Sequence, residues 1–270
     1  MKTRLTITLS QSTLDAIDRL IDKKRIRSRS HAIEHLLQKS LQPRLSTALI
    51  LAGGEKHADQ PSRPLTLLND KPLIVHTIEH LQKFGVTKIV IATNESGKDI
   101  QTLLGEGKSL GVEIKYVFEA SPAGTAGAIL SAQKYLSDGP FFVIAGDVLT
   151  TIDLEAMAEF HTQQGGLLTM AVKPRSTLST YDNVFIEGHT VVDFQRSTPE
   201  QTVSIVNAGV YLFEPEVLEW IPKKSPAMLE SDVFPQLAKS QKLLAFPFQG
   251  IWFDITSDQN YQAALQQLGY

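Results

Sequence analysis

A short apolar segment that ends in two glycines constrains this chain more than any other feature. Residues Ala48–Ala52 are consecutive and apolar, which predicts a fully buried strand. Gly53 and Gly54 end it, and the next regular pattern, with helical spacing, begins at Leu73. Such a strand presents backbone N–H groups at the carboxyl edge of a sheet, where open α/β sheets bind ligands and glycine lets phosphate approach. Two glycines after a strand are also typical of an ordinary turn, so other segments must decide.

Strand-like and helix-like patterns alternate after this segment, which predicts an α/β fold with a mostly parallel sheet covered by helices. After Pro174 the pattern becomes richer in strands, and an amphipathic helix from about Asp258 closes the chain. The expected strands are 47–52, 87–93, 113–118, 141–145, 167–172, 184–186, 191–194, 204–213 and 252–254. The expected helices are 74–84, 97–107, 125–136, 153–164 and 230–240.

Composition excludes several classes of protein. The 270 residues are 42% hydrophobic and 20% charged, as in an ordinary globular chain. The absence of cysteine excludes disulfides, thiolate zinc sites and thiol nucleophiles. No apolar run approaches the roughly 18 residues of a membrane span, and no signal-peptide pattern begins the chain. We therefore expect a cytoplasmic protein without a membrane partner.

An uneven distribution of charge indicates two modules. Residues 1–44 contain ten Lys or Arg against four Asp or Glu, whereas the remainder contains 16 basic and 25 acidic residues. A basic head on an acidic body suggests different partners for the two parts. We expect one module at residues 1–43 and a second at 47–270, joined by a short linker that contains Pro43.

The basic head has the pattern of one strand and two helices. Met1–Leu9 alternates apolar residues with cationic or hydroxyl residues, which predicts a half-buried strand. Ser10 is an expected N-cap for a first helix, and Ser28 or Ser30 for a second. Forty residues of this kind bury too little surface to fold alone, so the head should be an obligate homodimer.

The order and length of these elements, with a Ser-Arg-Ser entry to the second helix, resemble the ribbon-helix-helix family of DNA-binding modules. In that family two chains pair their strands into a ribbon that enters the major groove of double-stranded DNA. The resemblance implies that the strand meets base edges and that the start of the second helix meets a phosphate. The other interpretation is a module for dimerisation, or for a higher oligomer, whose basic face is only solvated. The implied DNA-binding residues are Lys2, Arg4, Thr6, Ser28, Arg29 and Ser30.

Five motifs follow one another in the body. They are LAGG at Leu51–Gly54, PAGTAGAI at Pro122–Ile129, AGDVL at Ala145–Leu149, VNAGVYLFEPEVL at Val206–Leu218 and WFDI at Trp252–Ile255. In this order they resemble the sugar-1-phosphate nucleotidyltransferase family, which includes glucose-1-phosphate thymidylyltransferases and mannose-1-phosphate guanylyltransferases. The resemblance covers almost all of residues 47–268 and implies a Rossmann-like three-layer domain. It also implies binding of a nucleotide or sugar nucleotide together with Mg²⁺.

The motifs place suitable chemistry at strand ends and at a helix start. Asp147 follows an apolar strand and Asp254 lies within one, and two carboxylates suit a Mg²⁺ ion that also binds phosphates. Asn207 has amide donors for a sugar hydroxyl, although a strand-end turn explains it equally well. Small residues that open a helix let its backbone lie against a base, with an ordinary helix cap as the alternative. The expected nucleotide-binding residues are Leu51, Ala52, Gly53, Gly54, Gly124, Thr125 and Ala126.

The chain departs from the family where the reaction needs cations. Family members continue the first motif with a further Gly, a Thr and a catalytic Arg. Here that loop is about five residues short, and Arg63 stands where the family has Lys. The Glu-Lys-Pro that follows the hairpin in the family is replaced by Gln195, Arg196 and Ser197. Phosphoryl transfer depends on such charge neutralisation, so Lys56, Arg63, His57 or Arg196 would have to supply it.

Two functions remain open from the sequence. Retained carboxylates and glycines, with lost cations, favour a nucleotide-binding regulator on DNA that responds to a metabolite and has weak or absent turnover. The alternative is an active, divergent enzyme in which Asp147, Asp254, Lys56 and Arg63 are catalytic and the head only fixes the oligomeric state. A scaffold that binds no ligand is a third interpretation.

Overall fold

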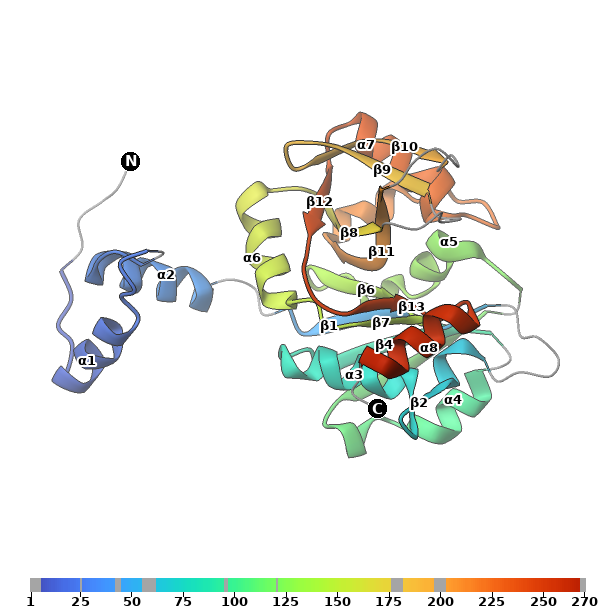
Figure 1. Cartoon of the computed structure of the whole chain (residues 1–270), viewed down its shortest axis with the longest axis horizontal. Coiled ribbons are helices and arrows are strands. Elements are labelled where there is room, and N and C mark those ends of the chain that lie inside the picture. Colours follow the sequence, from blue (N-terminus) through green and yellow to red (C-terminus); the bar gives the residue numbers. More distant parts are fainter. Residues whose placement is uncertain are drawn as a thin grey trace. The chain divides into compact units, whose positions relative to one another are not determined.

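The structure, a computed structural model, describes residues 6–24, 26–41, 45–54, 62–94, 97–119, 121–175, 182–196 and 203–267. The chain forms two compact units, Met1–Arg44 and Leu45–Tyr270, each described by itself below (Figure 1). Four residues with predicted roles, Lys2, Arg4, Lys56 and His57, lie outside the described residues.

The N-terminal unit contains the two expected helices, α1 (Gln11–Arg19) and α2 (Arg29–Leu41). Ser10 is the N-cap of α1, because its hydroxyl accepts a hydrogen bond from the N–H of Thr13. The hydroxyl of Ser28 does the same for the N–H of His31 at the start of α2, at 3.2 Å. The hydroxyl groups of Ser10 and Ser28 therefore cap the first turns of α1 and α2 and fix where both helices begin.

The strand expected over residues 1–9 is absent from its described part, where residues 6–9 belong to no strand. Residues 1–5 of this expected strand lie outside the described residues, and a ribbon strand is stable only with a second strand beside it. In the described part of this unit only Ile17 and Ala32 are buried apolar residues. The unit leaves a large apolar surface uncovered, because Ile7, Leu20, Leu36 and Leu37 are 40–49% exposed.

A nine-stranded sheet forms the centre of the C-terminal unit, in the order β5-β4-β1-β6-β11-β8-β12-β10-β9. β1 (Thr47–Leu51) lies between β4 (Lys88–Thr93) and β6 (Phe141–Ala145), and these strands are parallel. β11 (Ser204–Phe213) runs antiparallel to β6 and to β8 (Leu168–Arg175), so the second half of the sheet is mixed. The other strands are β5 (Glu113–Phe118), β9 (Asp182–Glu187), β10 (Thr190–Arg196) and β12 (Leu243–Pro247), with two small pairs, β2 (Leu67–Leu68) with β3 (Lys71–Pro72) and β7 (Val148–Thr150) with β13 (Trp252–Asp254).

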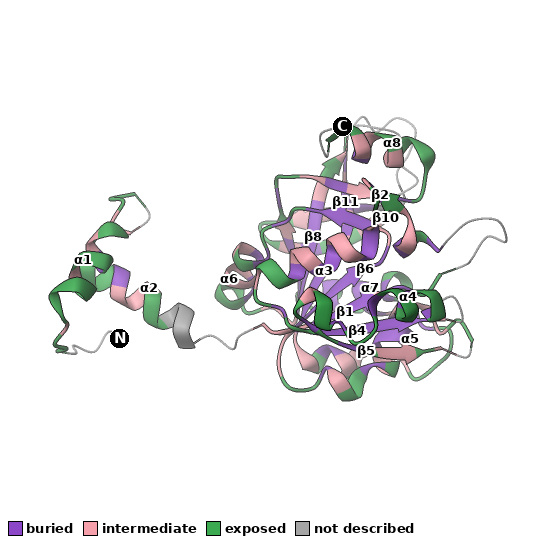
Figure 2. Ribbon diagram, turned by 90° about the horizontal axis from the view of Figure 1, so that it is seen from below, coloured by how far each residue is buried: buried purple, intermediate pink, exposed green. Residues whose placement is uncertain are grey.

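Helices cover both faces of the sheet, which confirms the three-layer α/β fold. Successive residues of β1 show why: Leu49 packs with α5 and α7 on one face, whereas Ile50 packs with α3, α4 and α6 on the other. Figure 2 shows the strands buried between these layers. The helices are α3 (Leu73–Lys83), α4 (Gly97–Leu104), α5 (Gly124–Ser131), α6 (Leu154–Gln164), α7 (Phe234–Lys239) and α8 (Asp258–Gln267), with short turns η1 (Arg63–Leu65), η2 (Lys108–Leu110), η3 (Gln133–Tyr135), η4 (Pro215–Trp220) and η5 (Leu229–Val233).

This unit differs from the sequence-based expectation in several elements: β2, β3 and β7 are not predicted, and the helix expected at 125–136 is α5 followed by the turn η3. The sequence does not predict β12, a short strand that pairs parallel to β8. The helix expected at 230–240 divides into a π-helical turn, η5, and α7, where Pro235 stands in the first helical turn. Among the described residues, no helix is both long enough and apolar enough to cross a membrane.

Candidate functional site

The glycine segment after β1 borders a small cavity at the carboxyl edge of the parallel strands. The cavity is lined by Leu51–Gly54, Ser62–Pro64 and Gly146–Asp147. A Cβ atom on Gly54 would meet none of the described residues within 4 Å, so these residues leave space beside this glycine. Gly146 is confined instead, because a Cβ atom there would lie 2.8 Å from the carbonyl oxygen of Leu51. The described residues therefore leave space beside Gly54 and pack closely against Gly146.

The structure brings the two predicted metal carboxylates, Asp147 and Asp254, together. β7 and β13 pair antiparallel with Asp254 opposite Val148, and the N–H of Ile255 donates to the carbonyl oxygen of Asp147 at 2.8 Å. Burial raises the pKa of Asp147, the negative charge of Asp254 raises it further, and Arg63 acts in the opposite direction. A divalent cation relieves this kind of carboxylate repulsion.

Arg63 reaches Asp147 from the turn η1. Its Nη1 atom lies 3.3 Å from Oδ2 of Asp147, and the two side chains are 48% and 27% exposed. An ion pair so accessible to water is weak. The neighbouring hydroxyl of Ser62 is buried and has no hydrogen-bond partner among the described residues. Asp147 therefore holds the guanidinium of Arg63 only weakly.

The residues at this edge fit Mg²⁺ with two protein ligands. Mg²⁺ is typically held by one or two carboxylates, substrate phosphates and water. The described residues contain no group of three or more His, Asp or Glu placed to hold a metal ion. Asp147 and Asp254 are thus suited to share a metal with phosphate oxygens rather than to enclose it.

The start of α5 owes its small residues to packing. The N–H groups of Ala126 and Gly127 donate to the carbonyl oxygen of Ala227, at 3.0 and 3.1 Å. Gly124 has φ +80°, and a Cβ atom there would lie 2.3 Å from the same oxygen. The hydroxyl of Thr125 donates to Glu230 and accepts from the N–H of Leu229. Base binding through the N–H of Ala126 is therefore ruled out in this conformation, because Ala227 uses that donor.

Asn207 lies on β11 at an irregularity in its pairing with β8. Its Oδ1 accepts from the N–H of Gly209 at 3.0 Å, and its Nδ2 donates to the hydroxyl of Tyr211 at 2.8 Å. One amide hydrogen is left for a ligand, so the predicted sugar contact remains a prediction.

Glu119 is a residue at this edge that sequence reasoning missed. It follows β5, its N–H donates to the carbonyl oxygen of Thr93, and its Oε2 atom would lie 3.5 Å from a Cβ atom on Gly53. Its Oε1 atom is buried with no hydrogen-bond partner among the described residues. Burial raises the pKa of Glu119, while a backbone hydrogen bond at Ala123 acts in the opposite direction. The signal in the sequence was a lone carboxylate between a strand and the PAGTAGAI motif.

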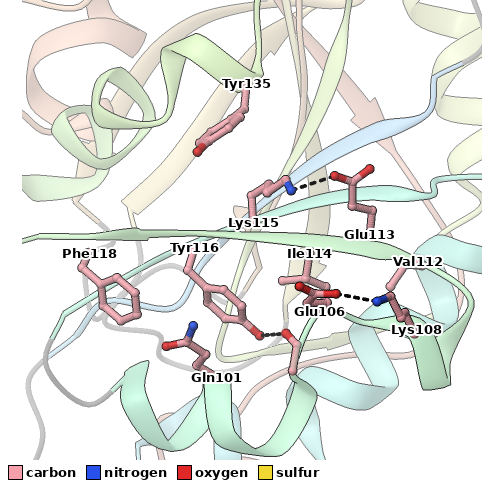
Figure 3. Close-up of a pocket in the computed structure, with 11 residues that line it drawn as sticks. Gln101, Glu106, Lys108, Val112, Glu113, Ile114, Lys115, Tyr116, Phe118 and Tyr135 are labelled. Atoms are coloured by element: carbon pink, nitrogen blue, oxygen red, sulfur yellow. Dashed lines mark hydrogen bonds and ion pairs between the residues drawn. The ribbon is translucent and has the colours of Figure 1, made fainter.

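A more spacious cavity, about 740 Å³, lies elsewhere, along the outer edge of β5 (Figure 3). Two ion pairs, Lys115 with Glu113 and Lys108 with Glu106, flank it. The hydroxyl of Tyr116 donates to the carbonyl oxygen of Gly105. Charges on an edge strand protect it from pairing with other strands, so this groove carries no sign of the predicted chemistry.

The fold and this edge define a class: a three-layer α/β protein of the nucleotidyltransferase type, preceded by a ribbon-helix-helix module. The chain belongs to the Nucleotidyl transferase family, whose profile matches residues 47–269. The profile of the ribbon-helix-helix proteins of the copG family matches residues 3–41.

Individual relatives agree with this assignment. Mannose-1-phosphate guanylyltransferase 1 of Arabidopsis thaliana is 34% identical over 230 residues, which cover 81% of this chain and 63% of that protein. The catalytic subunit beta of mannose-1-phosphate guanylyltransferase from Dictyostelium discoideum is 33% identical with the same coverage. The chain thus spans just under two thirds of the length of these curated relatives. The crystal structure of HddC from Yersinia pseudotuberculosis shares the fold, with a TM-score of 0.73 at 23% identity, over 83% of this chain and 99% of that one.

Proposed function

We propose that the C-terminal unit binds a guanine nucleotide or its sugar derivative with Mg²⁺, and that the N-terminal module couples this binding to DNA. The observation that supports the proposal most is the pair of carboxylates Asp147 and Asp254, of which Asp147 lines the same cavity as Gly54. Bound Mg²⁺ would neutralise phosphate charge there. The two carboxylates hold the metal, and the backbone of Gly53 and Gly54 allows the phosphates to come close.

Turnover should be weak or absent, because the shortened loop has no counterpart of the family's Gly-Thr-Arg. Loss of a cation that stabilises a transferring phosphoryl group costs roughly three decades in rate or more. The test is pyrophosphate release by the full chain with Mg²⁺, GTP and mannose-1-phosphate, compared with an active relative. A rate within about tenfold of the relative would contradict weak turnover.

A second candidate is an active sugar-1-phosphate nucleotidyltransferase. It is favoured by the contact of Arg63 with Asp147 and by relatives named as mannose-1-phosphate guanylyltransferases. Here Arg63, with Lys56, would bind the departing pyrophosphate, and the N-terminal module would only fix the oligomeric state. This candidate is selected if the wild type releases pyrophosphate about as fast as an active relative and if Arg63→Ala lowers that rate.

Base preference should depend on Glu119. A carboxylate accepts two hydrogen bonds side by side, and guanine is the common base with two adjacent donors, N1–H and the N2 amino group, on one edge. Glu119→Gln should weaken GTP binding roughly tenfold or more, since hydrogen bonds to charged groups are the strong ones, and leave ATP binding unchanged. Calorimetry with GTP and ATP measures both.

Glu113→Gln is the matched control, because Glu113 lies on β5, the strand that Glu119 follows, pairs with Lys115 and is 60% exposed. It should bind both nucleotides as the wild type does. Equal losses of GTP and ATP binding in Glu119→Gln would show a structural role and contradict base recognition.

The N-terminal module should form a dimer that binds double-stranded DNA. The exposed apolar residues Ile7, Leu20, Leu36 and Leu37 need a cover, and a second copy of the module supplies one. Arg29 is held by Asp18 through two hydrogen bonds of 2.7 Å, so its expected phosphate contact competes with an ion pair. Thr6, Ser28 and Ser30 remain predicted contacts.

Removal of Lys2 and Arg4, the cations of the expected N-terminal strand, should weaken DNA binding more at low salt than at high salt. Lys2→Ala with Arg4→Ala should lower affinity for double-stranded DNA and reduce the slope of log K against log salt by up to about two, because a ribbon with two fewer cations in the groove displaces fewer counterions from the DNA. Fluorescence anisotropy at several salt concentrations measures this. Lys239→Ala, in α7 of the other unit, is the control, and an unchanged slope in the double variant would contradict DNA binding by these cations.

A further inference from the structure

β8 presents two cations on one face of its carboxyl end. Lys173 and Arg175 are separated by Pro174, and because side chains alternate along a strand, both project to the same side. Both are half-buried, whereas Pro174 is exposed. Neither residue has a role in the site described above.

Aromatic rings, rather than carboxylates, support these cations. The Nζ atom of Lys173 lies 4.8 Å from the ring centre of Phe248 and donates to the carbonyl oxygen of Gly250. The guanidinium of Arg175 lies 5.0 Å from the ring centre of Trp252. Rings hold a cation in place without neutralising it, so both charges remain available to an anion.

The hydrogen-bonding capacity of Arg175 is largely unused. A guanidinium has five N–H donors, and to the described residues Arg175 makes one hydrogen bond, a long one of 3.4 Å to Oδ1 of Asn260. Its Nε atom is buried with no partner among the described residues. Within the same residues, neither Arg175 nor Lys173 forms an ion pair with a carboxylate.

The two positive charges also act on each other. Burial lowers the pKa of Lys173, and the charge of Arg175 lowers it further. Two like charges at one place with no counter-ion destabilise the folded chain, and a bound anion removes that cost.

We propose that Lys173 and Arg175 form an oxyanion site that binds a phosphate group. The planar fork of Arg175 takes two phosphate oxygens, and Lys173 supplies a point charge beside it. The site adjoins the acidic pair, because Nδ2 of Asn260 donates to the carbonyl oxygen of Asp254 at 2.8 Å. The phosphate is either free, as inorganic phosphate or pyrophosphate, or the end of a nucleotide held at Asp254. This site lies beyond the proposed function, which assigns no role to β8.

The test titrates pyrophosphate into the full chain by calorimetry, with EDTA present. The wild type should bind it, and Lys173→Gln and Arg175→Gln should each weaken binding roughly tenfold or more. Arg175→Lys should retain part of the affinity, which separates loss of charge from damage to the fold. Lys242→Gln is the matched control, since Lys242 lies 5.0 Å from the ring centre of Trp220 in the same kind of contact.

Two further arms identify the source of the phosphate. Pyrophosphate binding in EDTA should persist in Asp147→Asn, so failure of the metal site and failure of this site are distinguishable. If pyrophosphate alone does not bind but Arg175→Gln weakens binding of GTP with Mg²⁺, the site serves the nucleotide. If both glutamine variants bind pyrophosphate and GTP as the wild type does, the proposal is overturned.

Discussion

Replacing Asp147 by Asn should lower the affinity of the chain for GTP with Mg²⁺ roughly 100-fold or more. Substituting groups that only orient a metal ligand already costs about 10- to 100-fold in metal affinity, and loss of a ligand's charge should cost at least as much. The substitution keeps the size of the side chain. It also removes the repulsion between Asp147 and Asp254, so the folded chain should not be destabilised. Calorimetry with GTP, in Mg²⁺ and in EDTA, measures the change.

Asp153→Asn is the control for this substitution. Asp153 caps α6 by accepting from the N–H of Ala156 at 2.9 Å, and Asn caps equally well, so only a distant charge is lost. A second signature is pH. Because burial and Asp254 raise the pKa of Asp147, protons compete with Mg²⁺ at a higher pH than for an ordinary Asp, and wild-type binding should fall as the pH falls through that raised pKa. Unchanged affinity in Asp147→Asn would contradict the metal site.

Much of the fold could be predicted because its signals are local. The five apolar residues before Gly53 predict a buried strand because a glycine pair marks their end, and β11 is predicted with its observed ends, Ser204 and Phe213. β12 was missed because five residues give too little periodicity to separate a strand from a loop. The strand expected at residues 1–9 depends on a second chain, which no pattern within one chain supplies.

The candidate site was predictable in its residue types but not in its contacts. The adjacency of Asp147 and Asp254 follows from the pairing of β7 with β13: the sequence predicts the strand 252–254, but neither β7 nor the pairing of the two strands. Glu119 was missed because burial and lack of a partner are properties of the packed structure. The sequence assigns Gly124, Thr125 and Ala126 to a base, whereas Gly124 lies against Ala227 and the N–H of Ala126 donates to the carbonyl oxygen of Ala227. A glycine in the sequence indicates close packing, but only the structure shows whether the neighbour is a ligand or, as at Gly124, the backbone of Ala227.

The largest expected loss of stability belongs to Gly124→Ala. At φ +80° an L-residue already costs roughly 1–2 kcal/mol. The added Cβ atom would also lie 2.3 Å from the carbonyl oxygen of Ala227 and 2.8 Å from the sulfur of Met228. Backbone that accepts two hydrogen bonds from α5 cannot withdraw without breaking them, so we expect a total loss of about 4 kcal/mol or more in the free energy of unfolding. Urea denaturation measures it.

Gly165→Ala separates the two causes of this loss. Gly165 caps α6 at φ +68°, a similar conformation, but a Cβ atom there meets nothing within 4 Å. It should therefore show only the backbone cost of roughly 1–2 kcal/mol. The difference between the variants then measures how tightly the start of α5 is held against Ala227. If both variants lose the same stability, the close approach of Gly124 to Ala227 is absent in solution. The N–H groups of Ala126 and Gly127 are then free to donate to a base.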